Sequence, residues 1–234
     1  MLEFRRRAHQ LVGRVLHALD ADLLLNAECY FGGGTQLSLT YGEYRESRDI
    51  DFLCSSRTGF RKLRECVTQN SLGKIVRRPL KLAREVRADR EGIRTFFAVD
   101  DVRIKLELLL EGRIDLGGAI DKTLGVPVLT IDHATAEKFL ANTDRGLDES
   151  ALGRDLIDLA FLAANVGKRG LLPGLQVAEG AYGSAVRRSL AESLDSLQKN
   201  RARSAAWLES LRVSDTETLR RGLRVLRTLV SPSL

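Results

Sequence analysis

Residues 31–54 constrain this chain more than any other stretch, because a glycine run there precedes a short segment that carries two aspartates. The run Gly32–Gly34 permits a tight turn between a short strand and a helix. Asp49 and Asp51 follow after fourteen intervening residues and flank Ile50. Side chains alternate along a strand, so the two carboxylates should share one face, about 6.6 Å apart along the backbone.

Two carboxylates on one face of a strand repel each other unless a cation lies between them. Mg²⁺ suits this position because it binds carboxylate oxygens and keeps other coordination sites for water and phosphate. A glycine turn at a helix start can also present backbone N–H groups to phosphates. The pattern predicts a site for a nucleoside triphosphate and its metal. The alternative is a solvated pair of acids beside a structural turn, and neither a GKS/GKT phosphate loop nor a GxGxxG fingerprint is present.

A third carboxylate would complete such a metal site, and Glu107 is the candidate. It lies in the expected strand 102–110, on the polar face that it shares with Lys105. Lys105 either neutralises phosphate or balances Glu107. A metal ligand and a solvated Lys–Glu face therefore both remain possible for this position.

Composition indicates a globular protein with a preference for anionic partners. The 234 residues are 44% hydrophobic, and the net charge of +6 favours RNA or DNA as a partner. The three cysteines form no CxxC pair, which fits a reducing compartment and disfavours a zinc site. We find neither a signal-peptide pattern nor an apolar run of about 18 residues, and so expect a cytoplasmic location with no membrane partner.

Hydrophobic periodicity divides the chain near residue 130 and indicates an α+β protein. We expect the strand 27–31, the aspartate strand 49–54, and a hairpin of the strands 93–99 and 102–110. Helices are expected over 4–20, 35–40, 57–70, 133–143 (with Asp132 as N-cap) and 149–167, with two or three more over 175–229. The basic segment 73–90 contains Pro79, which should limit regular structure there. We therefore expect a catalytic domain over 1–130 and a helical domain over 131–234.

The helical half contributes further polar candidates. Lys138, Asn142 and Arg145 fall on one helical stripe by their spacing. Asp158 lies four residues after Arg154, a spacing typical of a surface ion pair. Apolar residues surround this part of the chain, however, so we expect at least one acid here close to buried surface, where it needs a partner. Farther on, ten Lys and Arg stand against five acids between residues 187 and 227, which indicates either an RNA-docking face or an ordinary solvated surface.

Four blocks of the sequence occur in an order that resembles a known family. The chain is similar to nucleotidyltransferases of the AbiEii/AbiGii toxin type, within the DNA-polymerase-β-like superfamily. The matching blocks are Gly33-Gly34-Thr35, Arg45-x-Ser47-x-Asp49-Ile50-Asp51-Phe52, Ile104-Lys105-Leu106-Glu107, and Ala136-Glu137-Lys138 through Arg145 to Arg154-Asp155-x-x-Asp158.

The resemblance implies a nucleotidyltransferase fold, with a small mixed β-sheet flanked by helices and followed by a C-terminal helical bundle. It implies that Asp49 and Asp51 hold Mg²⁺ or Mn²⁺, that Lys138 reaches the phosphates, and that Asp155 is a catalytic or site-organising acid. The residues implied to contact the triphosphate of the NTP substrate are Gly33, Gly34, Thr35 and Ser47.

The resemblance also implies a function. Members of this family are toxins of toxin–antitoxin or phage-defence systems, and some transfer nucleotides from an NTP to the 3′ end of tRNA. A cognate antitoxin, often of the winged-helix type, is then the protein partner. Two alternatives stay open: a catalytically inactive nucleotide-binding regulator, and a nucleotidyltransferase for small molecules. The positive net charge weighs against the second, because such substrates are commonly cationic.

Overall fold

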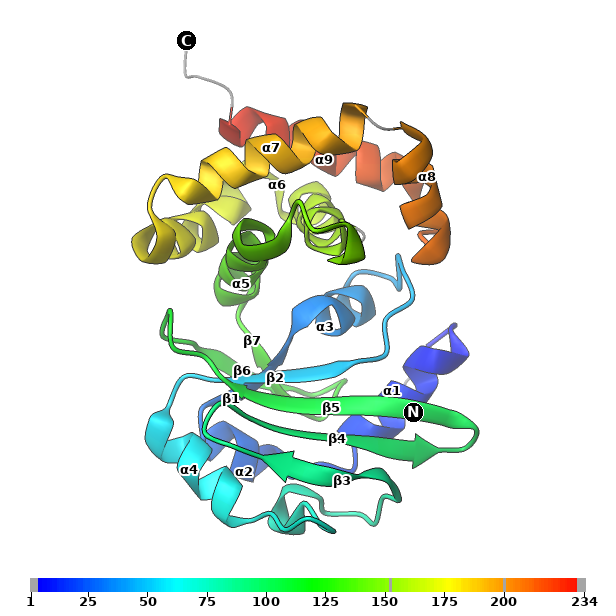
Figure 1. The fold of residues 1–234 in the computed structure, drawn as a ribbon, viewed down its shortest axis with the longest axis vertical. Helices are drawn as coiled ribbons and strands as arrows, with labels where there is room; N and C mark the ends of the chain where they lie inside the picture. Colours follow the sequence, from blue (N-terminus) through cyan, green and yellow to red (C-terminus); the bar gives the residue numbers. More distant parts are fainter. Residues whose placement is uncertain (1–3, 152, 200, 231–234) are drawn as a thin grey trace. The chain divides into compact units, whose positions relative to one another are not determined.

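The computed structural model describes residues 4–151, 153–199 and 201–230, which fold into two compact units (Figure 1). One unit comprises Met1–Leu39 and Ser47–Thr130, and the other comprises Thr40–Glu46 and Ile131–Leu234. The seven-residue segment Thr40–Glu46 therefore belongs with the helices of the C-terminal half. A single boundary near residue 130 would assign this segment to the first unit, whereas its contacts lie in the second.

The first unit contains a mixed sheet, with the strand order β3-β4-β5-β2-β1-β7-β6 among the described residues. Strand β2 runs antiparallel to β1 and parallel to β5, whereas β4 and β5 form an antiparallel hairpin. The fold class is therefore α+β, as predicted. The strands are β1 (Cys29–Gly32), β2 (Ile50–Cys54), β3 (Leu82–Ala88), β4 (Gly92–Val99), β5 (Val102–Leu110), β6 (Gly118–Asp121) and β7 (Val126–Leu129).

Helices α1 (Arg7–Leu16), α2 (Ala21–Asn26) and α4 (Arg57–Glu65) cover one face of this sheet, whereas α3 (Gly33–Thr40) follows β1 directly (Figure 1). Burial alternates along β2, where Ile50, Phe52 and Cys54 are buried and the intervening residues are partly exposed. The buried side chains pack with apolar residues of α1, α2 and α4 in one core. The residues between them therefore lie on the opposite face, and Asp51 is one of these.

Several elements of this unit differ from the expectation. The expected helix 4–20 is shorter in the structure, where α1 ends at Leu16. Asp20 caps the next helix, α2, by accepting a hydrogen bond from the backbone N–H of Leu23 at 2.8 Å. The expected helix 57–70 ends at Glu65. Strand β3 forms within the basic segment 73–90 despite Pro79, since that proline lies before the strand begins. Its pairing with β4 contains register shifts, which hide the period-two pattern from the sequence.

The second unit consists mainly of helices. They are α5 (Ile131–Arg145), α6 (Arg154–Tyr182), α7 (Ala185–Lys199), α8 (Arg201–Ser210) and α9 (Thr216–Val230). The predicted N-cap Asp132 is wrong, because α5 already begins at Ile131 and Asp132 lies in its first turn. Helix α6 is interrupted at Gly167, where the predicted helix ended and where φ is 68°. None of the described helices combines the length and apolarity that crossing a membrane requires.

Candidate active site

The sheet register places the first group of predicted residues in one row. Asp51 on β2 lies opposite Gly32 on β1 and, on its other side, opposite Glu107 on β5. Neighbouring residues in register point to the same face, so the two carboxylates project together on the face opposite the core. Asp49 directly precedes β2 and is exposed. The strand geometry thus brings Asp51 and Glu107 side by side.

The glycine turn lies directly against Asp51. Gly33 has φ +71°, a conformation that side chains with a Cβ rarely adopt. A Cβ added at Gly33 would lie 3.0 Å from Oδ2 of Asp51. Helix α3 starts at this glycine, so the first N–H groups of the helix, which lack intrahelical partners, lie next to a carboxylate.

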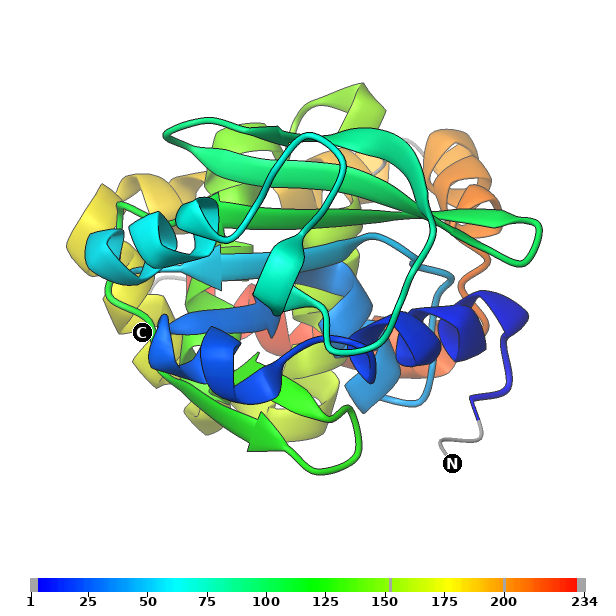
Figure 2. The same ribbon diagram turned by 90° about the horizontal axis from the view of Figure 1, so that it is seen from below.

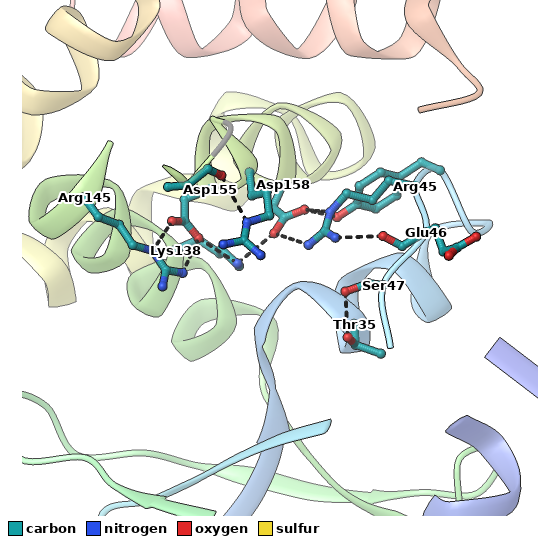
Figure 3. A network of polar contacts seen from close by, with 11 residues as sticks. Thr35, Arg45, Glu46, Ser47, Lys138, Arg145, Asp155 and Asp158 are labelled. Carbon is teal, nitrogen blue, oxygen red and sulfur yellow. Dashed lines mark hydrogen bonds and ion pairs between the residues drawn. The ribbon is translucent and has the colours of Figure 1, made fainter. Parts of the chain in front are cut away.

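Thr35 and Ser47, both predicted to contact the triphosphate, contact each other. Their hydroxyl oxygens are 2.7 Å apart, which links α3 to the chain that enters β2 (Figure 3). The backbone N–H of Ser47 also donates to Nε2 of the buried His9, at 3.1 Å. Sequence spacing gives no signal for this contact, because the two residues are 38 positions apart. His9 and Thr35 therefore fix the position of Ser47 just before the aspartates.

Glu107 has cationic neighbours on its own face of the sheet. Lys105 Nζ lies 2.6 Å from its carboxylate, and Arg94 of β4 lies 3.4 Å from it. No three His, Cys, Asp or Glu side chains form a ready metal-binding group within the described residues. The donor chemistry nonetheless fits a hard divalent cation, since Asp49, Asp51 and Glu107 offer carboxylate oxygens. Asp51 and Glu107 lie in register on adjacent strands, and Glu107 already has two cationic partners.

The second group of predicted residues forms a buried ionic network in the helical unit (Figure 3). Asp158, with no exposed surface, accepts hydrogen bonds from Tyr44 Oη at 2.7 Å and from Arg45 Nε at 2.7 Å and Nη2 at 3.0 Å. Lys138 Nζ lies 2.7 Å from Asp158 and 2.9 Å from Asp155. Arg145 completes the group through its Nε, 2.7 Å from Asp155. Both aspartates are therefore paired with the buried Lys138, Asp158 also with the buried Arg45, and Asp155 also with the exposed Arg145.

These charges determine the protonation state of the network. Burial alone would raise the pKa of Asp155, but the positive charges of Lys138 and Arg145 outweigh burial and lower the pKa to about 2. Burial would likewise raise the pKa of Asp158, and Arg45 and Lys138 lower it well below the ordinary value. The pKa of Lys138 is raised, because its two carboxylate partners outweigh its burial. All of these groups are therefore charged at neutral pH.

One interpretation of the sequence in this region is wrong. Arg154 does not pair with Asp158 on the surface; its Nε donates to the carbonyl oxygen of Ala151 at 3.0 Å. Asp158 faces inward because it lies on the apolar side of α6, and it pairs with Arg45, which precedes it by 113 residues. The alternative, that an acid here would need a buried partner, is confirmed.

The segment Thr40–Glu46 is held to the helical unit by more than this ion pair. The ring of Tyr44 stacks on Phe161 of α6 with centroids 3.9 Å apart. The carbonyl oxygen of Tyr44 accepts a hydrogen bond from Ser214 N at 3.0 Å, and Glu46 N donates to Leu211 O at 3.0 Å. No local pattern in the sequence points to Tyr44. The only sequence signal for Arg45 is its place in the Arg45-x-Ser47-x-Asp49 block.

Comparison with protein families decides the relationship. The family described as nucleotidyl transferase AbiEii toxin, type IV toxin–antitoxin system, matches residues 14–223. The chain belongs to the AbiEii nucleotidyltransferase toxin family. The match spans both units, so the AbiEii relationship covers the sheet with its glycine turn as well as the helices with their ionic network. No curated protein sequence matches the chain.

Solved structures share the fold of this AbiEii family member. A putative nucleotidyltransferase from H. pylori aligns with a TM-score of 0.56 at 18% identity, covering 98% of this chain and 96% of that one. JHP933 from Helicobacter pylori aligns with a TM-score of 0.55 at 18% identity, covering 97% and 93%. MenT4, a nucleotidyltransferase toxin from Mycobacterium tuberculosis H37Rv, is also similar at 17% identity over 96% and 94% of the two chains, with a TM-score of 0.36.

Proposed function

We propose that this protein is a toxin that transfers nucleotides from an NTP to an RNA, with the 3′ end of tRNA as the acceptor. The observation that carries the proposal is the contact of the Gly33 turn with Asp51. It combines a carboxylate pair and a helix start in one place, within a chain of the AbiEii family. A divalent cation uses the carboxylates, and a triphosphate uses the N–H groups of the helix start.

In the proposed reaction, the 3′-hydroxyl oxygen of the RNA attacks the α-phosphorus of the NTP in line with the leaving group. The new bond joins this oxygen to phosphorus, the bond from phosphorus to the pyrophosphate oxygen breaks, and the hydroxyl proton passes to a basic oxygen or to solvent. Asp49 and Asp51 are proposed to hold Mg²⁺ or Mn²⁺, with Glu107 as a third carboxylate. The bound cation would supply neutralisation of the phosphates and activation of the hydroxyl.

The remaining residues are proposed to bind and orient the nucleotide. Gly33 and Gly34 would present backbone N–H groups to the triphosphate, and the hydrogen-bonded Thr35–Ser47 pair would fix the wall beside it. Lys138 is proposed to reach the phosphates, with Asp155 organising its ammonium group. The type IV toxin–antitoxin family further supports an antitoxin as the natural partner, and we propose one of the winged-helix type.

The test is transfer of label from each α-labelled NTP to total tRNA in the presence of Mg²⁺ or Mn²⁺. Wild-type protein should label RNA, and Asp51→Asn should reduce the rate by at least about a hundredfold, because the metal would lose a charged ligand. Asp101→Asn is the matched control, since this exposed aspartate lies six residues, or about 20 Å, from Glu107 along β5. Absence of labelled RNA with every NTP would favour the inactive regulator, and equal rates for both variants would remove the metal assignment.

A further inference from the structure

The positive charge of this protein is concentrated in one segment of the first unit. Residues 57–90 contain eleven Lys and Arg and three acids, a net charge of +8, whereas the whole chain carries +6. The rest of the chain is therefore slightly acidic, with a net charge of −2. All eleven basic side chains are exposed. We call the surface that they form, on α4 and on residues 74–90, the basic face.

Most cations of the basic face have no acidic partner within the part of the chain that the structure describes. Arg77 pairs with Asp20 and Asp22, while Arg61 and Arg90 each have an acid at 3.8 Å on their own segment. The other eight form neither an ion pair nor a side-chain hydrogen bond there. They are Arg57, Lys62, Arg64, Lys74, Arg78, Lys81, Arg84 and Arg87. Exposed cations in such number repel one another and favour binding of an anion.

The arrangement of these cations is extended. Those at Arg57, Arg61 and Arg64 follow one stripe of α4 over about 10 Å. Lys81, Arg84 and Arg87 recur every third residue over about 20 Å of β3 and the residue before it. Figure 2 views this side of the unit, with α4 and the chain leading to β3 in front of the sheet. Three of these cations, Arg61, Arg64 and Arg87, line a groove of about 770 Å³ between α4 and β3, together with the acids Glu65, Glu85 and Asp89.

The lining of this groove indicates the kind of partner. It contains no aromatic side chain, and its apolar members are small: Val67, Val86 and Ala88. Protein–protein interfaces concentrate aromatic anchors at their centre, and the groove offers none. Binding to a membrane surface needs an exposed apolar face, yet Phe60 and Leu63 of α4 are buried in the core. The three cations and three acids of the groove balance each other, so the unpaired cations around it carry the excess charge. A long polyanion that contacts these surrounding cations fits best.

We propose that the basic face binds the sugar–phosphate backbone of the acceptor RNA. This inference rests on the proposed function, because it assigns a docking surface to the proposed acceptor. Helix α4 lies on the side of the sheet that carries the core. Strand β3 presents Arg84 and Arg87 on the other side, because their partners on β4 share the face of Glu107 and Asp51. The basic face therefore reaches from the core side, round the β3 edge of the sheet, to the face that carries Asp51. Without aromatic side chains for base stacking, binding depends on salt and not on sequence.

The C-terminal helices present the main competing surface. Their arginines are more often paired: Arg187 with Glu179, Arg203 with Glu149, Arg212 with Glu46 and Arg227 with Asp195. The side chain of Arg201 lies outside the described residues. The excess of +5 there spreads over 41 residues, against +8 over 34 in the basic face. The basic face thus has the higher density of charge available to phosphates.

The test compares two triple charge reversals in the full chain. Arg64→Glu/Arg84→Glu/Arg87→Glu alters the basic face, and Arg220→Glu/Arg221→Glu/Arg224→Glu makes the same change of charge on α9. Binding of fluorescently labelled total tRNA is measured by anisotropy at several salt concentrations, without NTP. The first variant should weaken binding at least tenfold and reduce the slope of log K against log salt by about 2. The α9 variant should weaken binding less than threefold, and circular dichroism checks that both variants are folded.

Each outcome has a defined consequence. Equal weakening by the two variants, greater weakening by the α9 variant, or tighter binding of wild type to phosphatidylserine vesicles than to tRNA would overturn the inference. Asp51→Asn separates it from the proposed function, since this variant should bind tRNA like wild type. RNA binding through the basic face without any transfer would contradict the proposed function alone. Normal transfer and tRNA binding by the basic-face variant would contradict the inference alone.

Discussion

Replacing Asp158 with asparagine should destabilise the helical unit more than any surface substitution of the same kind. Asp158 has no exposed surface and accepts hydrogen bonds from Tyr44 and Arg45, with Lys138 at 2.7 Å. The amide has nearly the same shape but no charge, and its NH₂ group would face donors. Removing one partner from a buried ion pair costs about 3–5 kcal/mol, because the remaining charge stays buried without compensation.

That magnitude is large compared with the total stability of a domain, which is about 5–15 kcal/mol. Urea unfolding followed by circular dichroism should therefore show a clear shift of the transition that belongs to the helical unit. The matched control is Asp195→Asn, which makes the same chemical change in an exposed ion pair with Arg227. It should leave the transition unchanged, because solvent screens that pair.

A double variant checks the physical reason. Adding Arg45→Met to Asp158→Asn removes the buried cation that has lost its bidentate partner, so part of the stability should return. If Asp158→Asn unfolds at the same urea concentration as Asp195→Asn, the network does not contribute in the way that its burial implies, and the reasoning is refuted.

Three further predictions concern pH and two glycines. The pKa of Asp155 is lowered to about 2, so the ionised carboxylate stabilises the folded protein fully above pH of about 4, and this contribution is lost as the pH falls toward about 2. In acid unfolding over this window, wild type should lose about 2.5 kcal/mol of stability relative to Asp155→Asn, and parallel pH profiles of the two proteins would contradict the assignment. Gly33→Ala should lower the affinity for NTP at least tenfold in calorimetry, because the new Cβ would press on Asp51. Gly42→Ala is the control for backbone strain, since Gly42 has φ +76° and no atom near its added Cβ, and equal effects of the two variants would refute the role of the contact. Gly222→Ala should destabilise by about 1–3 kcal/mol or more in urea unfolding, since its Cβ would lie 1.7 Å from a carbonyl oxygen of α6, and an unchanged midpoint would show that the helices can separate there without loss.

Local chemistry made much of the first unit predictable. The alternation along β2 indicates a strand with one buried face, and the structure confirms it with Ile50, Phe52 and Cys54 inside. The hairpin of β4 and β5 follows from two apolar runs joined by Asp100-Asp101. The glycine run is confirmed as the strand-to-helix turn, because Gly33 adopts a positive φ at the start of α3. In each case the residues that decide the structure are neighbours in the chain.

Contacts between distant residues decided the rest. The sequence places Glu107 only on a polar strand face, and the register of β2 with β5 then sets it beside Asp51. Strand β3 forms because β4 offers it an edge, although its own residues lack a clear period. Arg45 and Asp158 are 113 positions apart, so no local pattern could pair them, and their ion pair holds Thr40–Glu46 within the helical unit. Burial and strand register depend on the whole chain, whereas turns and periodicity depend on a few adjacent residues.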